Sequence, residues 1–242
     1  GFFIMPITIY LIWRKRQELA QQSIRSNWWG FGYVVLWIVL YGAGVIGQIA
    51  TIMYLSMLVF LLAAATVLIG TQAAQTIAYP VMFLVFMFPI PSEIYFRATN
   101  PLLLISTSIS FHILNLLSVP VLQDGNLLTL PNYTMKVVQA CSGIRSLVSI
   151  MSLAFLMGYL MLRSNMFRLV FFLLSVPTAI LGNILRISAT AILAYHFSPQ
   201  AAEGFSHIMA GIVTFIFSFI LLFGFMEFFL WLSRKREQSY SS

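Results

Sequence analysis

Charge is scarce in this chain. Only 8% of its 242 residues are Asp, Glu, Lys or Arg, whereas soluble domains have about 25%. Thirteen basic and six acidic residues cannot cover the surface of a 27.3 kDa globule, and 60% of the residues are apolar. The mean hydropathy is +0.94. This composition excludes a soluble enzyme, a nucleic-acid-binding protein and a disordered linker, and it predicts an integral membrane protein.

Cysteine is almost absent as well. With Cys141 alone, the chain can form neither an intrachain disulfide nor a cysteine-based metal site. The sequence also lacks the HExxH string of zinc peptidases and the GxSxG string of serine hydrolases. We therefore expect no metal and no cofactor, and the sequence disfavours a serine or metal intramembrane protease.

Long apolar runs fill most of the chain. A membrane-spanning helix needs about 20 apolar residues, and the fourth run ends at FPIP (88–91), where two prolines stop a helix. The chain opens inside an apolar run without Met, so we expect a truncated N-terminus and a single transmembrane domain over residues 1–242. The predicted fold is an all-α integral membrane protein, a polytopic helical bundle of about seven spans: 1–13, 28–46, 50–70, 72–90, 142–162, 167–194 and 207–232.

Residues 101–118 are ambiguous because they are long enough to span but rich in Ser, Thr, His and Asn. Basic clusters at 14–25, 163–168 and 234–236 decide between the alternatives, since positive clusters stay on the cytoplasmic side. All three fall on that side only if 101–118 does not cross. The sequence therefore favours an interfacial or re-entrant amphipathic helix here.

That topology leaves one sizeable extracytoplasmic segment, 123–140. Asp-Gly-Asn and Pro-Asn are turn signals, and LLTL and YTMKVV between and after them resemble short strands. Unpaired backbone cannot face lipid. We expect a small extracytoplasmic hairpin on the membrane surface.

Three ionisable or nucleophilic residues lie at helix ends near the extracytoplasmic face: Cys141, Arg186 and His207. The pKa of a thiol falls at a helix N-terminus or beside a cation, which makes it a nucleophile. A histidine can protonate a leaving amine, and an arginine can stabilise an oxyanion or the thiolate. Structural alternatives stay open for each: a small buried residue, a snorkelling arginine and a polar residue at a helix start.

Further residues support this set. Arg145 follows Cys141 by four residues and supplies a second cation one turn into the same helix. Gly143 and Gly211 allow close approach of backbone or a neighbouring helix. Glu227 is expected near the cytoplasmic end of the last helix, paired with the terminal basic cluster.

The order of these motifs resembles the exosortase/archaeosortase family. The resemblance rests on DGNLLTLPNYTMKVVQACSGIRS (124–146), NILR (183–186), HIMAG (207–211) and FPIP. It implies a missing upstream helix, hence eight spans in the intact protein. It also implies that Cys141, Arg186 and His207 are the catalytic residues, with Ser142, Gly143, Arg145, Asn183 and Gly211 in supporting places. Many relatives carry an acidic residue where this chain has Gln139.

The resemblance also implies a function. Exosortases are membrane cysteine enzymes proposed to act as transpeptidases on secreted proteins with a C-terminal tripartite signal. That signal comprises a short motif (Pro-Glu-Pro in the PEP-CTERM class), a transmembrane helix and a basic tail. We expect cleavage through a Cys thioester at the extracytoplasmic face of the inner (cytoplasmic) membrane, with water or a lipid or glycan amine as acceptor and membrane lipids as surroundings. The alternatives are a transporter or a non-catalytic component of polysaccharide export.

Overall fold

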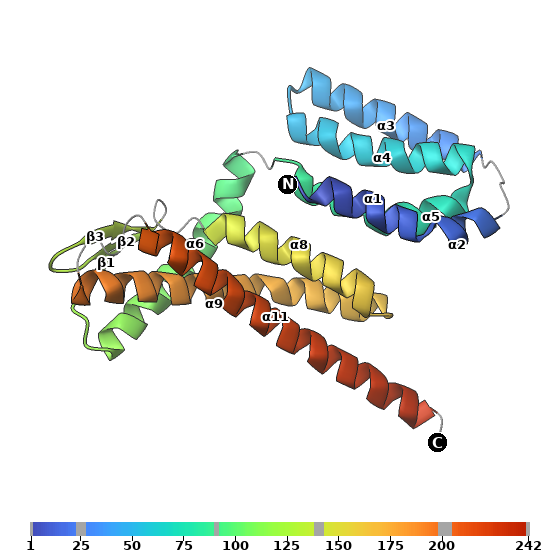
Figure 1. Cartoon of the computed structure of the whole chain (residues 1–242). Helices are drawn as coiled ribbons and strands as arrows, with labels where there is room; N and C mark the ends of the chain where they lie inside the picture. Colours follow the sequence, from blue (N-terminus) through green and yellow to red (C-terminus); the bar gives the residue numbers. More distant parts are fainter. Residues whose placement is uncertain (1, 23–27, 90–91, 138–142, 198–204, 241–242) are drawn as a thin grey trace. The chain divides into compact units, whose positions relative to one another are not determined.

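The computed structural model describes residues 2–22, 28–89, 92–137, 143–197 and 205–240. The chain divides into two compact units, Gly1–Ser92 and Glu93–Ser242, and each is described by itself (Figure 1). The expectation of a single domain over residues 1–242 stays a prediction.

The first unit is helical in its described part. Its elements are α1 (Ile4–Arg14), α2 (Arg16–Gln21), α3 (Trp29–Ile46), α4 (Ala50–Leu68), α5 (Thr71–Phe83) and the 3-10 helix η1 (Leu84–Met87). Leu58, Val81 and Leu84 form its buried cluster, against which residues of α1, α4 and α5 pack. The run expected as one span over 72–90 is therefore an α-helix that tightens into a 3-10 turn before Phe88.

Glycines set the distance between α3 and α4. A Cβ atom at Gly30 would lie 3.0 Å from the backbone nitrogen of Val67, and one at Gly44 would lie 3.0 Å from that of Met53. Such distances are too short for an ordinary Cβ contact, so these two backbones approach closely because the side chains are missing. Small residues at helix contacts are typical of membrane proteins, in which close packing replaces the hydrophobic effect between helices.

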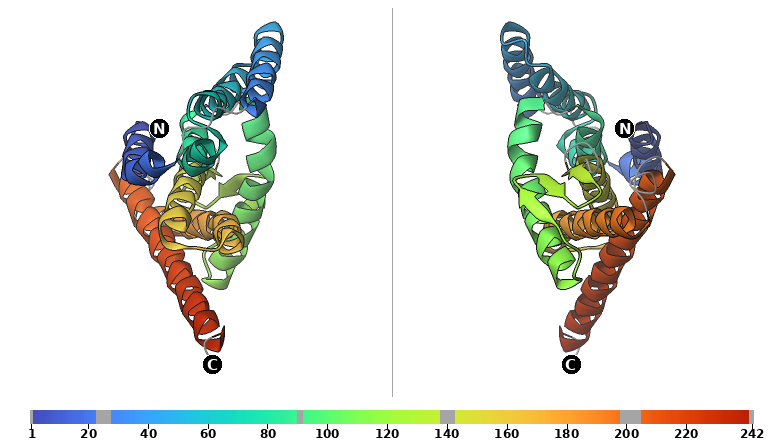
Figure 2. Two further views of the ribbon diagram at one scale, coloured as in Figure 1. Left: turned by 90° about the vertical axis from the view of Figure 1, so that its right-hand side faces the viewer. Right: turned by 90° about the vertical axis from the view of Figure 1, so that its left-hand side faces the viewer.

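In its described part, the second unit combines four helices with a small sheet. The helices are α6 (Ser92–Leu116), α8 (Gly143–Met161), α9 (Asn165–His196) and α11 (Phe205–Tyr240). Figure 2 shows α11 as one long, continuous helix. A cluster that includes Ile150 of α8, Phe171 of α9 and Leu222 of α11 holds three of the helices together.

The sheet occupies the segment for which the sequence predicts a hairpin, with one strand more than expected. Strands β1 (Leu122–Asp124), β2 (Leu127–Thr129) and β3 (Thr134–Lys136) pair antiparallel in that order. Gly125 turns the chain between β1 and β2 at a φ of 57°, a left-handed conformation that favours glycine. The side of the membrane on which the sheet lies stays a prediction.

The outer surface of the helices is apolar. On α3, Phe31, Val35, Ile38 and Val39 are all more than half exposed. A contiguous face of this kind has no place in water and suits the hydrocarbon of a bilayer. Within the ranges that the structure describes, three helices are long and apolar enough to cross a membrane: Ala50–Leu68, Asn165–His196 and the Gly211–Lys235 part of α11. The chain is thus a helical integral membrane protein, while the count of seven spans stays a prediction.

Helix α6 is longer than the ambiguous segment 101–118, because it starts at Ser92 and continues through Pro101. It buries hydroxyls and exposes aliphatic side chains. Ser106 and Ser110 are buried, whereas Ile105 and Ile109 are exposed. The face of α6 that turns away from the protein is therefore suited to lipid. Whether the helix crosses the bilayer or lies in the interface stays a prediction.

Candidate functional site

A polar stripe on α9 contains the site residues that the structure places most fully. Asn183, Arg186 and Thr190 are spaced i, i+3 and i+7, so they lie on one side of the helix. Asn183 Oδ1, Arg186 Nε and Thr190 Oγ1 are all buried. The Asn183 and Thr190 oxygens have no hydrogen-bond partner among the residues that the structure describes. Buried polar atoms are normally paired, so this stripe needs further polar contacts.

Arg186 extends from α9 to α11. A Cβ atom at Gly211 would lie 3.9 Å from Nη2 of Arg186 and 4.0 Å from its Cζ. The guanidinium thus lies against the bare backbone of α11 at Gly211. Gly211 is one helical turn after His207 in the HIMAG string. The structure brings together Arg186 and Gly211, two residues that the sequence singled out from motifs 25 positions apart.

His207 is placed through its position on α11. It precedes Gly211 by four residues in the helix Phe205–Tyr240, so its backbone lies one turn away on the same side. That side of α11 is the one against which Arg186 packs. Proximity of the imidazole and the guanidinium stays a prediction.

The sheet is attached to α9 beside the polar stripe. Leu128, Met135 and Val137 share a buried cluster with Ile187, the neighbour of Arg186 in sequence. In addition, Asn132 Nδ2 donates a hydrogen bond to the carbonyl oxygen of Ala194 at 2.9 Å. The strand that leads toward the cysteine therefore ends next to the arginine-bearing part of α9.

Cys141 and Ser142 lie outside the described residues. The described chain resumes at Gly143, which is the first residue of α8, and Arg145 belongs to the first turn of that helix. Helix α8 packs along α9, as Ile150 and Phe171 show by sharing one buried cluster. The roles expected of Cys141, Ser142, Gly143 and Arg145 stay predictions.

The structure adds two residues to those expected from the sequence. Thr190 extends the polar stripe by one turn beyond Arg186, and Gly182 lies one turn before Arg186 against Ser218 and Thr214 of α11. Helical spacing from Arg186 (i−4 and i+4) is the signal that could have identified both. Within the described ranges, no group of three or more His, Cys, Asp or Glu side chains could hold a metal ion.

The apolar helices and the guanidinium of Arg186 between α9 and α11 define a class of protein, a polytopic membrane protein with a polar site between two packed helices. Comparison with known families identifies the class further. The model of the transmembrane exosortase family matches residues 1–224, and the chain therefore belongs to that family. No curated protein and no solved structure matches the chain.

Proposed function

We propose that this chain is a membrane cysteine peptidase and transpeptidase that cleaves C-terminal sorting signals of secreted proteins. Membership of the transmembrane exosortase family supports a transpeptidase-like role on proteins that carry sorting signals. In this proposal Cys141 is the nucleophile, Arg186 stabilises the oxyanion or the thiolate, and His207 protonates the leaving amine. The site lies at the extracytoplasmic face of the cytoplasmic membrane.

The contact between Arg186 and Gly211 is the observation that carries the proposal. It joins the NILR motif of α9 to the HIMAG motif of α11, and it leaves a cation one helical turn from the backbone of His207. An arginine that acted only as an interfacial anchor would extend to water. Here the Nε of Arg186 is buried and its guanidinium packs on a neighbouring helix.

Chain connectivity supports a position of Cys141 near this pair. It is the fourth residue after Val137, which packs with Ile187, and four residue steps of extended chain span at most about 14 Å. It is the second residue before Gly143, where α8 begins. The N-terminal end of a helix favours an anion, so this position also favours the thiolate form of the cysteine.

The proposed reaction has two steps. The thiolate sulfur of Cys141 attacks the scissile carbonyl carbon and forms a C–S bond, and the negative charge moves to the carbonyl oxygen, where Arg186 stabilises it. The C–N bond then breaks while His207 donates a proton to the departing amine. Water or an acceptor amine then attacks the resulting thioester and gives a proton to His207, and the C–S bond breaks to release the thiolate for another cycle.

The first experiment follows removal of the C-terminal helix from a model secreted protein with a tripartite signal, by mass shift in cells that express the chain. Wild type is compared with Cys141→Ser, Arg186→Ala and His207→Ala. Arg163→Ala and His112→Ala are the matched controls, because Arg163 and His112 are exposed and lie outside the proposed site. Loss of processing in the first three variants alone supports the proposal. Equal processing by Cys141→Ser would remove the nucleophile and favour a scaffold or transporter.

A second measurement exploits the single cysteine of the chain. Any thioester between this chain and the substrate must involve Cys141, because no other residue of the chain has a thiol. We expect a hydroxylamine-sensitive adduct with wild type, and its accumulation when acceptor amines are withheld. An adduct of the same mass that survives hydroxylamine would contradict a thioester.

A further inference from the structure

The sheet of the second unit has an edge strand, β3, on the side that leads toward Cys141. The strand order is β1-β2-β3, so within the sheet β3 pairs with β2 alone. An edge strand presents N–H and C=O groups that its own sheet does not pair. Such an edge can accept a strand from another chain, and main-chain hydrogen bonds then supply the affinity.

The ladder between β2 and β3 shows which backbone groups are used inside the sheet. Tyr133 and Leu130 exchange two hydrogen bonds, at 2.8 and 3.4 Å, and the amide of Val137 donates to the carbonyl of Asn126 at 3.0 Å. Hydrogen-bonded and non-hydrogen-bonded residues alternate along an antiparallel strand. Met135, midway between Tyr133 and Val137, therefore also points its backbone groups at β2.

Thr134 and Lys136 have the opposite orientation. Their N–H and C=O groups point away from β2, toward the free edge, and their side chains are exposed. Among the described residues, no backbone group pairs with them. Unpaired strand backbone is not left facing hydrocarbon, so this edge lies in water or against another protein segment.

Only an extended segment can continue this ladder. A helix pairs its backbone groups within itself, and the described part of the first unit is helical. The first unit therefore supplies no strand from its described residues, wherever it lies relative to the sheet. The strands that the structure describes are already in the sheet. A further strand at this edge has to come from outside the described residues.

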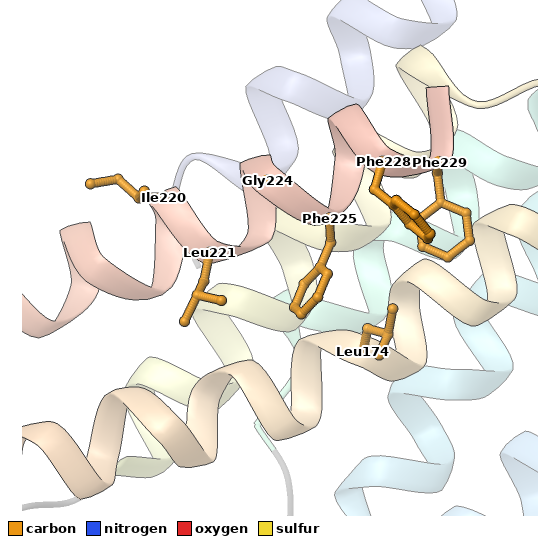
Figure 3. Close-up of a pocket in the computed structure, with 7 residues that line it drawn as sticks. All are labelled: Leu174, Ile220, Leu221, Gly224, Phe225, Phe228 and Phe229. Atoms are coloured by element: carbon orange, nitrogen blue, oxygen red, sulfur yellow. The ribbon is translucent and has the colours of Figure 1, made fainter. Parts of the chain in front are cut away.

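The edge belongs to the part of the second unit that holds the proposed site. Met135 shares a buried cluster with Ile187, the neighbour of Arg186 in sequence. By contrast, the groove between α9 and α11 is lined by apolar residues such as Leu174 and Phe225 (Figure 3). That groove suits apolar groups, because peptide backbone placed there would lose its hydrogen bonds to water without replacing them. Of the two places, the sheet edge is the one that can hold an extended peptide.

We propose that the β3 edge binds the extracytoplasmic segment of the substrate as an added strand. The N–H and C=O groups of Thr134 and Lys136 pair with every second residue of this segment. An extended segment has no internal hydrogen bonds, so its carbonyls stay open to attack by a nucleophile. The inference rests on the proposed function for the identity of the bound chain, but it concerns binding, and no bond has to break.

The test uses the full-length Cys141→Ser protein in lipid nanodiscs, in which no thioester can form. The probe is a synthetic peptide that comprises the extracytoplasmic segment and the transmembrane helix of the model substrate used for the processing experiment. Each residue of the segment is N-methylated in turn, which removes one N–H group. A photo-crosslinking side chain at position 134 reports capture. Position 122 is the matched control, because Leu122, Thr129 and Thr134 are cross-strand neighbours and Leu122 lies on the opposite edge.

We expect a two-residue period in this series. Capture from position 134 should fall about 2- to 12-fold when the methylated residue is one that faces β3, which corresponds to the loss of one net hydrogen bond. It should stay unchanged at the residues between, because only alternate residues of a strand point their N–H groups at the same neighbour. Capture from position 122 should be weak throughout.

Single N–H groups can also be removed from the protein. The α-hydroxy acid analogues of Thr134 and Lys136 replace the amide by an ester and keep the side chain, and each should lower capture by a similar factor. The analogue of Gln123 is the control, because its N–H faces the opposite edge and its side chain keeps the hydrogen bond to Ser108. The analogue of Met135 removes a bond between β2 and β3, so it should lower Tm more than the others.

Four results would overturn the inference. Capture without a two-residue period would exclude an added strand. Equal capture from positions 134 and 122 would show that the β3 edge is not preferred. An ester at Lys136 that lowers Tm as much as one at Met135 would show that the edge is paired within the chain. Crosslinks between two copies of the chain, in place of peptide capture, would assign the edge to self-association.

The binding site and the proposed reaction can fail separately. Capture with a two-residue period, together with wild-type protein that processes no signal, would keep the binding site and remove the reaction. Processing that depends on Cys141, together with capture that lacks the period, would keep the reaction and remove the binding site.

Discussion

Gly182 of α9 lies directly against Ser218 of α11. A Cβ atom at position 182 would lie 3.5 Å from the Cβ of Ser218 and would overlap its hydroxyl oxygen. One turn further along α9, Arg186 lies against Gly211. The first contact therefore fixes how closely the two helices approach, and so whether the guanidinium can reach the backbone of α11.

Gly182→Ala tests this contact. Overpacking of a close contact usually costs about 1–3 kcal/mol, so the free energy of unfolding should fall by that amount and Tm with it. Ser218→Ala removes the overlapping oxygen and should restore most of the loss in the double variant. Gly224→Ala is the control, because its Cβ would meet nothing within 4 Å. Thermal unfolding of the purified protein in detergent measures the stability of the two single variants, the double variant and the control. A Gly182→Ala protein as stable as wild type would refute the contact.

Gly211 should tolerate a methyl group but not a larger side chain. At 3.9 Å from Nη2, a Cβ atom makes an ordinary van der Waals contact with Arg186. Gly211→Ala should therefore keep signal processing close to wild type. Gly211→Val adds two methyl groups in the space of the guanidinium and should reduce processing strongly while Tm changes little. The substrate mass shift described above is the readout. A valine variant with wild-type processing would show that the position of the guanidinium does not matter.

Arg186→Lys should be nearly as inactive as Arg186→Ala. Lysine keeps the charge but loses the planar fork of donors that holds an oxyanion. Removal of one oxyanion donor typically lowers kcat by about 10²–10³. Single-turnover rates of substrate cleavage measure the effect, with Arg163→Lys as the matched control. If Arg186→Lys cleaved at the wild-type rate, a charge alone would suffice and the oxyanion role would be lost.

The sequence predicted much of this architecture, because apolar runs and their stops are local features. The runs at 50–70 and 167–194 match α4 and α9 within a few residues. The start of α6 was missed, because Pro101 usually marks a helix boundary but here lies inside a helix that begins at Ser92. The strand β1 was missed because Leu-Gln-Asp has little strand propensity of its own.

The site was predicted less completely, for a physical reason. Motif order pointed to Arg186 and Gly211 separately, but their contact depends on the rotation of two helices about their axes. That rotation is set by small residues such as Gly182, whose partner Ser218 cannot be recognised from sequence spacing. Glu227 illustrates the same limit, because a basic cluster seven residues away suggested an ion pair that Arg234 and Lys235 do not form.

Measuring how deep residues of α6 lie in the bilayer can decide whether this helix crosses the membrane or lies in the interface. Gln123 of β1 donates a hydrogen bond to Ser108 of α6 at 3.1 Å, and Leu114 packs among the strands. Because unpaired strand backbone is not left facing hydrocarbon, we expect the part of α6 beside the sheet to lie near the membrane surface. We therefore expect the interfacial arrangement that the charge distribution favours. Its exposed aliphatic side chains would then rest on the outer edge of the acyl chains.

Nitroxide labels at Ile105 and Leu116 in a Cys141→Ser background test this expectation. Both side chains are exposed, and eleven residues of helix separate them by about 16 Å along its axis. In an interfacial helix the two labels should have similar depths, judged from their relative accessibility to oxygen and to a water-soluble nickel complex. In a crossing helix the depths should differ by most of that length. A large difference would reverse the side assigned to the 14–25 basic cluster, because one more crossing would separate it from the other two.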